Sequence, residues 1–222
     1  MITIALDGPS GAGKSTVCDI VADRLGILHL NTGALYRAVG LYLLRNNIDA
    51  SNEDLVIKAL PDIHIDVNYD DLVQRVILNG EDVSDDIYSM EVSNISSLSS
   101  PYIKVREYIT QIQRNIADKY DCIMEGRDIT SEVLPNAEYK FYLDASSDNR
   151  AIRRINDPKN KEHLTMEDFD RIKAEIEERD RRDKTRTNSP LVIVPDAHYI
   201  NSDSINANQV AQIIIDEVLR VK

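Results

Sequence analysis

The first chemical signal in the sequence is a glycine-rich segment close to the N-terminus. Residues 8–15 read G-P-S-G-A-G-K-S, which fits the phosphate-binding pattern G-x-x-x-x-G-K-[ST]. Glycines let such a loop wrap closely around phosphate oxygens and point its N–H groups at them. Lys14 can reach the outer phosphates of a nucleoside triphosphate, and the Ser15 hydroxyl can bind Mg²⁺. We therefore predict a triphosphate site formed by Gly8, Pro9, Ser10, Gly11, Ala12, Gly13, Lys14, Ser15 and Thr16.

Arginine is the second signal, because it recurs at expected strand ends and helix faces in an acidic chain. The 222 residues carry a formal net charge of −12. Guanidinium groups kept at such places indicate a site crowded with phosphate, which they bind through paired hydrogen bonds. Phosphoryl transfer between two phosphorylated partners depends on this kind of positioning and charge neutralisation. The arginines concerned are Arg37, Arg106, Arg127, Arg150, Arg153, Arg154, Arg179, Arg182 and Arg186.

The composition argues against several other classes of function. The negative charge disfavours binding to duplex nucleic acid, which usually requires a basic face. Cys18 and Cys122 suit small apolar core positions and form no disulfide framework, and the four histidines lack metal-ligand spacing. No apolar run is long enough to span a bilayer, and no signal peptide precedes the loop. We therefore expect a cytoplasmic protein with no membrane partner.

The phosphate loop must lie between a strand and a helix, and the sequence supplies both. Residues 2–6 form a short apolar run typical of a buried parallel strand, and residues 17–25 have helical spacing. This β-α alternation continues and predicts a doubly wound parallel sheet, with helices on both faces and the ligand at the carboxyl ends of the strands. Further strands are expected at 27–30, 122–124, 139–143 and 197–200, with helices beginning near 32, 51 and 147 and spanning 101–120, 165–183 and 206–221.

One part of the chain breaks this alternation. Residues 63–69 alternate strictly between apolar and polar, residues 76–78 are β-rich, and Asn79-Gly80 is a strong signal for a tight turn. A small antiparallel insert is therefore expected at 61–97, with residues 85–100 leading back to the core through a serine-rich segment. Around it we expect one domain over 1–222, with its core at 1–60, 98–150 and 180–222 and a short lid at 151–165.

The remaining motifs narrow the choice among phosphate-loop proteins. The chain has no Asn-Lys-x-Asp motif for guanine, and the strand ending at Glu125 is too short for an ATPase motor. Several sequence blocks, together with the antiparallel insert, resemble those of bacterial-type cytidylate kinases. The blocks are G-P-S-G-A-G-K-S-T, N-T-G-A-L-Y-R, V-S-N-I-S-S, V-R-E, E-G-R-D and R-D-R-R-D-K-T-R. The resemblance extends to about Leu191. It implies transfer of the γ-phosphoryl group of ATP to CMP or dCMP with Mg²⁺, in pyrimidine nucleotide metabolism, with the insert binding the monophosphate.

On the acceptor side, the resemblance implies that Arg37 and Arg127 bind the phosphate of the monophosphate. Thr32 would place a hydroxyl near the same group, where the family usually has Ser. Arg127 follows an expected strand, which is where an α/β sheet places its ligands. The alternative for Arg37 is a solvated arginine on its helix.

For the base, the resemblance implies recognition of cytosine by Ser97, Arg106 and Asp128. Cytosine has a keto oxygen, a ring-nitrogen acceptor and an amino donor, so it needs the mixed donors and acceptors that these side chains supply. Ser97 lies in a serine-rich segment, and a role as a helix cap is the alternative for it.

A charged segment late in the chain carries three more candidates at helical spacing. Arg179, Asp183 and Arg186 are spaced i, i+4 and i+7, so one helix face can present all of them. The resemblance implies that the two arginines bind phosphates and that Asp183 binds the sugar. The alternative is a solvated helix laced by i, i+4 pairs such as Glu175–Arg179.

The expected lid contributes further arginines. Arg150, Arg153 and Arg154 precede the segment N-D-P-K-N-K, and we predict that Arg154 or Arg153 moves to the transferred group when the lid closes over ATP. The predicted catalytic set is Lys14, Arg127, Arg154 and Arg179.

Two stretches depart from the family pattern. Glu125 replaces the usual Asp, and Ile129-Thr130-Ser131 replaces the usual x-Gly-Thr, which can change the loop backbone. Glu125 is expected either to orient a water bound to Mg²⁺ or to support other residues of the site. No general base is expected, because the attacking oxygen belongs to a phosphate that is already ionised at neutral pH. Asp7 is expected to orient the phosphate loop.

The leading hypothesis is therefore an ATP-dependent (d)CMP kinase that works as a monomer, with no nucleic-acid partner. Within the same class, a UMP/CMP-type kinase that prefers another monophosphate is the alternative. From another class, the alternative is a nucleotide-binding regulatory protein with weakened catalysis, although Lys14, Ser15 and Arg37 are all present.

Overall fold

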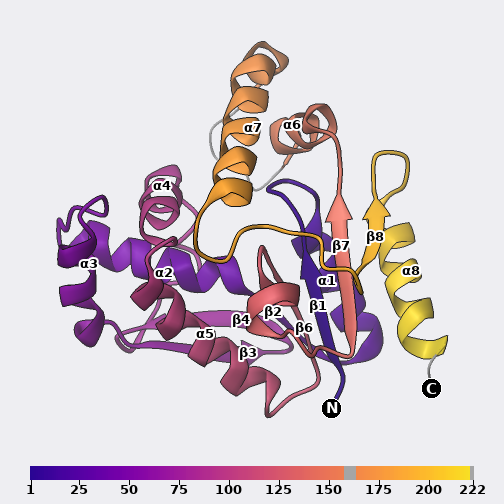
Figure 1. Ribbon diagram of the computed structural model, residues 1–222, viewed down its shortest axis with the longest axis horizontal. Helices are drawn as coiled ribbons and strands as arrows, with labels where there is room; N and C mark the ends of the chain where they lie inside the picture. The colour runs from indigo at the N-terminus through magenta and orange to yellow at the C-terminus, as the bar shows by residue number, and fades with distance from the viewer. Residues whose placement is uncertain (158–163, 221–222) are drawn as a thin grey trace.

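The computed structural model describes residues 1–157 and 164–220 and has a parallel sheet at its centre (Figure 1). The strand order is β2-β6-β1-β7-β8, and every neighbouring pair is parallel. This order confirms the predicted α/β class with a doubly wound phosphate-loop sheet. The strands span Thr3–Asp7 (β1), Leu28–Asn31 (β2), Cys122–Gly126 (β6), Tyr139–Asp144 (β7) and His198–Asn201 (β8).

Helices cover both faces of this sheet, because parallel strands are buried on both sides. In β1, Ile4 and Leu6 belong to the apolar cluster formed with α1 and α8. Between them, Ala5 belongs to the cluster on the opposite face, with Met124 of β6 and Ala117 of α5. The helices concerned span Lys14–Leu25 (α1), Ile103–Ala117 (α5) and Ala207–Arg220 (α8).

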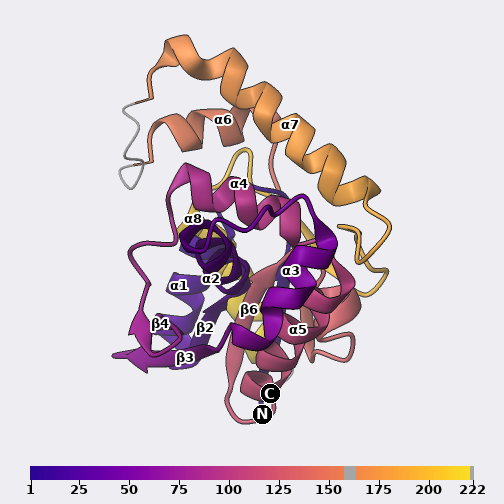
Figure 2. The same cartoon turned by 90° about the vertical axis from the view of Figure 1, so that its left-hand side faces the viewer.

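The carboxyl ends of the strands share one edge, where the candidate residues gather. The phosphate loop follows β1, α2 follows β2, and Arg127 follows β6. Helices α6 and α7 lie beyond this edge, at the end of the molecule opposite the N-terminus (Figures 1 and 2). A capping box formed by Thr165 and Asp168 precedes α7. These helices span Thr32–Arg45 (α2), Ser147–Ile155 (α6) and Phe169–Thr185 (α7).

The expected antiparallel insert is present as a three-stranded sheet in the order β3-β4-β5. Asn79 and Gly80 form the predicted tight turn, with positive φ angles of 50° and 87°. The insert meets the core where the N–H of Asn31 donates to Gln74 Oε1 at 2.7 Å. Its strands span Ile65–Asp70 (β3), Val73–Leu78 (β4) and Glu81–Asp82 (β5).

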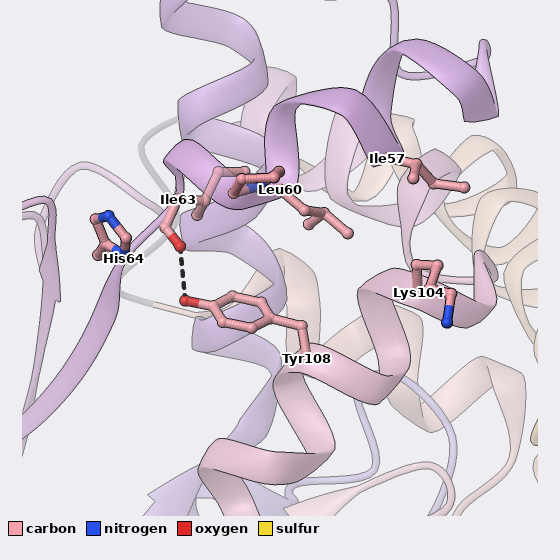
Figure 3. Close-up of a pocket in the computed structure, with 7 residues that line it drawn as sticks. Ile57, Leu60, Ile63, His64, Lys104 and Tyr108 are labelled. Carbon is pink, nitrogen blue, oxygen red and sulfur yellow. Dashed lines mark hydrogen bonds between the residues drawn. The ribbon is translucent and has the colours of Figure 1, made fainter.

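A second contact of the insert lies at α5, beside an apolar pocket (Figure 3). The Tyr108 hydroxyl donates to the Ile63 carbonyl at 2.8 Å and accepts from the Ile65 N–H at 3.0 Å. None of the predicted site residues lines this pocket, so it has no part in the chemistry described below. Its volume is about 440 Å³, and its lining is Ile57, Leu60, Pro61, Ile63, His64, Lys104 and Tyr108.

The serine-rich segment contains a helix that the sequence did not predict, α4 (Met90–Ser99). Ser89 caps it by accepting from the Val92 N–H at 3.2 Å. The helix packs on α2 at Gly40, where an added Cβ would lie 3.0 Å from the Val92 carbonyl oxygen. Close packing therefore stabilises this helix, although serine is a weak helix former.

The boundaries predicted for the core, the insert (61–97) and the lid (151–165) stay predictions. Residues 158–163 of that lid lie outside the described residues. In the part of the chain that the structure describes, no helix is both long and apolar enough to cross a membrane.

Candidate active site

The phosphate loop has the backbone geometry that its glycines predict. Gly8 approaches β7 so closely that an added Cβ would lie 2.0 Å from the Leu143 carbonyl oxygen, and Gly13 has a φ of 94° just before α1. Lys14 is 5 % exposed, and its Nζ donates to the carbonyls of Gly8 and Pro9 at 2.8 and 2.9 Å. Burial lowers the Lys14 pKa to about 7. Negatively charged phosphate oxygens beside this ammonium group would favour its protonated form.

Two arginines of α6 donate hydrogen bonds to carbonyl groups of the phosphate loop. Arg150 donates to the Ser10 carbonyl at 3.0 Å and to Asp180 Oδ2 at 2.6 Å. Arg153 donates to the Ala12 carbonyl at 3.0 Å. Arg153 or Arg154 was predicted to move to the transferred phosphoryl group. In this structure Arg153 is hydrogen-bonded to the phosphate loop.

Arg154 lies instead near a cluster of guanidinium groups at the carboxyl edge of the sheet. Burial lowers the Arg179 pKa to about 10, and the charges of Arg127, Arg37 and Arg154 add to this effect, although Asp183 opposes it. Three other guanidinium groups therefore act on Arg179, together with the carboxylate of Asp183. Such a cluster favours a bound polyanion, because guanidinium groups bind phosphates strongly.

The ion pairs along α7 bear on the two interpretations of its arginines, which are a phosphate-binding face and a solvated helix. Glu175 pairs with Arg171 at 2.8 Å, and Glu178 pairs with Arg181 at 2.8 Å. Arg179 pairs with neither glutamate in the described part of the chain, and its nearest charges are those of the cluster. The solvated-helix interpretation therefore applies to the outer face of α7 and not to Arg179.

Arg37 lies at the start of α2, where two neighbours hold its direction. Its Nη1 would lie 3.1 Å from a Cβ added at Gly33, and the Tyr88 ring covers its guanidinium at 5.3 Å from the ring centroid. Thr32 is 3 % exposed and donates its hydroxyl proton to the Glu125 carbonyl at 2.6 Å. This hydroxyl ties α2 to β6, and its contact with a substrate stays a prediction.

Arg106 and Asp128, two of the three predicted base-reading residues, form a buried ion pair. Arg106 Nη2 donates to Asp128 Oδ2, and both side chains are 7 % exposed. Arg106 also donates to the Ser189 hydroxyl at 3.0 Å and to the Ser100 carbonyl at 3.1 Å. Its guanidinium stacks on Tyr36, 5.5 Å from the ring centroid. These contacts fix both charged groups before any base arrives.

Asp183 connects this ion pair to the arginine cluster. It accepts from Arg127 Nε at 3.0 Å, and its Oδ1 lies 3.9 Å from Arg186 Nη1. Arg186 Nη2 lies in turn 3.7 Å from Asp128 Oδ1. Ser97 lines a pocket of about 230 Å³ together with Asp183 and Arg186. It lies inside α4 and caps neither end, so the helix-cap alternative for Ser97 is wrong.

Asp7 orients a different segment from the one expected. Its buried carboxylate accepts from the N–H groups of Ile129 and Thr130 at 2.9 and 2.7 Å and from the Thr130 hydroxyl at 2.6 Å. Burial raises the Asp7 pKa, while these hydrogen bonds oppose the rise. Asp7 thus anchors the π-helical turn Ile129–Val133, and Thr130 supplies two of the three bonds.

Replacing Thr130 by valine is expected to lower the free energy of unfolding by about 2 kcal/mol. Valine keeps the shape of threonine but removes a buried hydrogen bond to a carboxylate. Thermal unfolding checks the effect. Ser131→Ala is the control, because the buried Ser131 hydroxyl makes no hydrogen bond within the described residues. Equal losses of stability in the two variants would contradict the anchoring role of Thr130.

The surroundings of Ser15 suit a hard divalent cation. Ser15 is exposed at the start of α1, and Glu125 is buried near the end of β6. Burial by itself would raise the Glu125 pKa, but hydrogen bonds from His29 and Ser15 and the charge of Lys14 lower it to about 2. A hydroxyl and an ionised carboxylate are oxygen donors that Mg²⁺ uses directly or through water. The residues present therefore fit Mg²⁺.

Sequence reasoning missed Tyr36, Tyr88 and Asp180. Tyr36 and Asp180 stand inside the blocks N-T-G-A-L-Y-R and R-D-R-R-D-K-T-R, so membership of a block was a usable signal for both. Tyr88 lies outside the blocks, and only its contact with Arg37 reveals it.

Comparisons with known proteins agree with this geometry. The family model described as cytidylate kinase matches residues 4–220. The cytidylate kinase of Caldicellulosiruptor bescii is 40 % identical over 220 residues, which cover 99 % of this chain and 96 % of the relative. The cytidylate kinase of Bacillus anthracis is 37 % identical over 220 residues, which cover 99 % and 97 % of the two chains.

Solved structures share the fold at much lower identity. Shikimate kinase from Bacteroides thetaiotaomicron is 14 % identical, with a TM-score of 0.51 and coverage of 99 % of this chain and 98 % of that one. At this identity the likeness shows the fold alone. The family match is more specific, because it extends over nearly the whole sequence and includes the phosphate loop and the arginine cluster. The chain therefore belongs to the cytidylate kinase family and is a nucleoside monophosphate kinase.

Proposed function

We propose that the chain transfers the γ-phosphoryl group of ATP to CMP and dCMP, with Mg²⁺ bound beside Ser15. The observation that carries the proposal is the set of arginines whose charges converge on Arg179. The charge of one of them, Arg127, also acts on Lys14 of the phosphate loop. Positive charge thus continues from the loop to the cluster, as a site for the phosphates of two nucleotides requires.

The donor side is built on the phosphate loop. Its N–H groups and Lys14 bind the outer phosphates of ATP, while Arg150 and Arg153 hold the carbonyls of Ser10 and Ala12. Ser15 binds the cation. Mg²⁺, when bound, neutralises charge on the donor phosphates.

The acceptor side is built on Arg37 and Arg127, which hold the phosphate of the monophosphate. An oxygen of this phosphate attacks the γ-phosphorus, and the bond from that phosphorus to the leaving oxygen of ADP breaks. The attacking oxygen is already ionised, so no side chain has to remove a proton. Arg154 and Arg179 stabilise the charge that is spread over the transferred group.

The buried ion pair supplies the choice of base. Asp128 can accept from the 4-amino group of cytosine, and Arg106 can donate to its keto oxygen or ring nitrogen. Uracil has an oxygen in place of the amino group. This oxygen and the Asp128 carboxylate, both acceptors, would then face each other. Ser97 and Arg186 complete the base and phosphate contacts, and Asp183 binds the sugar. Because one copy of the chain carries donor and acceptor residues, we further propose that it works as a monomer, in the cytoplasm.

A coupled assay of ADP release tests the proposed function with CMP, dCMP, UMP and AMP as acceptors. We expect CMP and dCMP to have the highest kcat/KM. UMP as the best acceptor would overturn the proposal in favour of a kinase with another preference. Retained ATP binding without CMP-stimulated ADP release would indicate a regulatory nucleotide-binding protein.

Replacing Arg37 by alanine is expected to raise the KM for CMP roughly 10- to 100-fold, because hydrogen bonds to a charged phosphate are worth about 1.5–3 kcal/mol. The KM for ATP should stay nearly unchanged. Steady-state kinetics measures both values. Arg45→Ala is the matched control, since Arg45 lies on the same helix and pairs with Glu81 at the surface. An unchanged KM for CMP in Arg37→Ala would count against its contact with the acceptor.

A further inference from the structure

A buried histidine lies beside the carboxyl end of β6, and the mechanism above does not use it. His29 of β2 is 8 % exposed, and its Nδ1 lies 2.8 Å from Oδ1 of Asp19, an exposed residue of α1. Its Nε2 lies 3.4 Å from Oε1 of Glu125, which is 5 % exposed. Three elements therefore meet in one polar chain, Asp19–His29–Glu125.

Burial keeps the two inner atoms of this chain facing each other. Neither His29 Nε2 nor Glu125 Oε1 makes a hydrogen bond of normal geometry within residues 1–157 and 164–220. Buried polar atoms are rarely left without a partner, and these two lie within ion-pair distance of each other. Both nitrogens of the His29 ring thus face a carboxylate, Asp19 at Nδ1 and Glu125 at Nε2.

Glu125 also interacts with the phosphate loop. A hydrogen bond from Ser15 and the charge of Lys14 both favour its ionised form. Its carboxylate is thus shared between a histidine and the residues predicted to bind the cation and the donor phosphates. Holding the long side chain of a glutamate in one position costs rotamer entropy. A second anchor is what such a side chain needs to keep one position.

We propose that His29 is a positioning residue that acts through Glu125 and holds its carboxylate in the orientation that serves the cation and the donor phosphates at Ser15. The inference rests on the phosphoryl-transfer function proposed above. His29 itself touches neither the substrates nor the reacting atoms. Asp19 supports it, because a hydrogen bond at one ring nitrogen fixes the direction of the other.

Two amide variants test the two nitrogens of the His29 ring separately. His29→Asn places an amide near the position of Nδ1, where it can bond Asp19 but falls short of Glu125. His29→Gln places an amide near the position of Nε2, where it can still donate to Glu125. The readouts are kcat, thermal unfolding, and calorimetric binding of a non-hydrolysable ATP analogue with and without Mg²⁺.

The two variants should differ most in the gain of analogue affinity that Mg²⁺ provides. We expect His29→Asn to lose roughly tenfold of this gain and roughly tenfold in kcat, the size of effect typical of residues that support a metal site. His29→Gln should keep both within about threefold of the wild type. Equal losses in the two variants that simply follow their Tm would overturn the proposal, because they would indicate a structural role alone.

Adding the histidine variant to Glu125→Gln tests whether His29 acts through Glu125. If His29 acts through Glu125, adding His29→Asn to Glu125→Gln should cost little further Mg²⁺-dependent affinity, as for residues that work as a unit. Additive losses would overturn the proposal. The calorimetric readout needs only the nucleotide and Mg²⁺. If UMP were the preferred acceptor, the proposed function would be overturned. The comparison of the His29 and Glu125 variants would still decide the role of His29.

Discussion

Replacing Arg179 by alanine is expected to lower kcat for CMP phosphorylation about a thousand-fold, an effect in the range for arginines that stabilise a transferred phosphoryl group. Its guanidinium lies near those of Arg37, Arg127 and Arg154, and its pKa falls to about 10 through burial and their charges. Because the other three arginines remain in the variant, the KM values should change much less than kcat. Steady-state kinetics with CMP and ATP measures all three quantities.

Two further variants at α7 test the reason for this loss. Arg179→Lys keeps the charge but not the planar pair of donors, so kcat should recover only in part. Arg181→Ala removes an arginine that is 65 % exposed and pairs with Glu178, so it should leave kcat unchanged. If Arg179→Ala kept kcat within about tenfold of the wild type, the cluster would serve binding alone and another group would stabilise the transferred phosphoryl.

The parallel sheet could be predicted from the sequence because its signals are local. A short apolar run, the loop pattern and a helical pattern follow one another within residues 2–25, and β1 and α1 occupy these places. Helix α4 could not be predicted in the same way. Its ten residues include four serines, which favour caps and turns over helix interiors. Packing against Gly40 of α2 overrides this preference, and no local pattern reveals a contact between such distant segments.

The candidate site shows the same limit at the level of side chains. The sequence blocks contain Arg37, Arg127 and Arg179, because a motif carries residue identity, whereas Arg154 was predicted from its place before the expected lid. The place of Arg153 needed the structure, since this side chain donates to the Ala12 carbonyl, far away along the chain. The contact of His29 with Glu125 likewise joins two strands that only the sheet order places side by side.

Replacing Asp128 by asparagine is expected to lower the free energy of unfolding by about 3 kcal/mol, or the Tm by roughly 6–12 °C. Asparagine keeps the shape of the side chain but removes the charge that pairs with Arg106, and both members of this pair are 7 % exposed. Arg186, whose Nη2 lies 3.7 Å from Asp128 Oδ1, loses this counter-charge and keeps that of Asp183. Removing one member of a buried pair is costly because it leaves the other charge buried and uncompensated. Thermal unfolding of the purified chain measures the loss.

The control and the ligand dependence of the Tm separate this effect from base recognition. Glu107→Gln breaks the pair with Lys104 on the same helix as Arg106, but those side chains are 58 % and 60 % exposed, so the Tm should not change. CMP at the same high concentration should raise the Tm of the wild type more than that of Asp128→Asn, because the stabilisation by a ligand grows with the logarithm of its concentration divided by its Kd. A variant of lower Tm that responded to CMP as fully as the wild type would mean that Asp128 holds Arg106 in place without contacting the base. The choice of cytosine would then depend on Arg106 and Ser97.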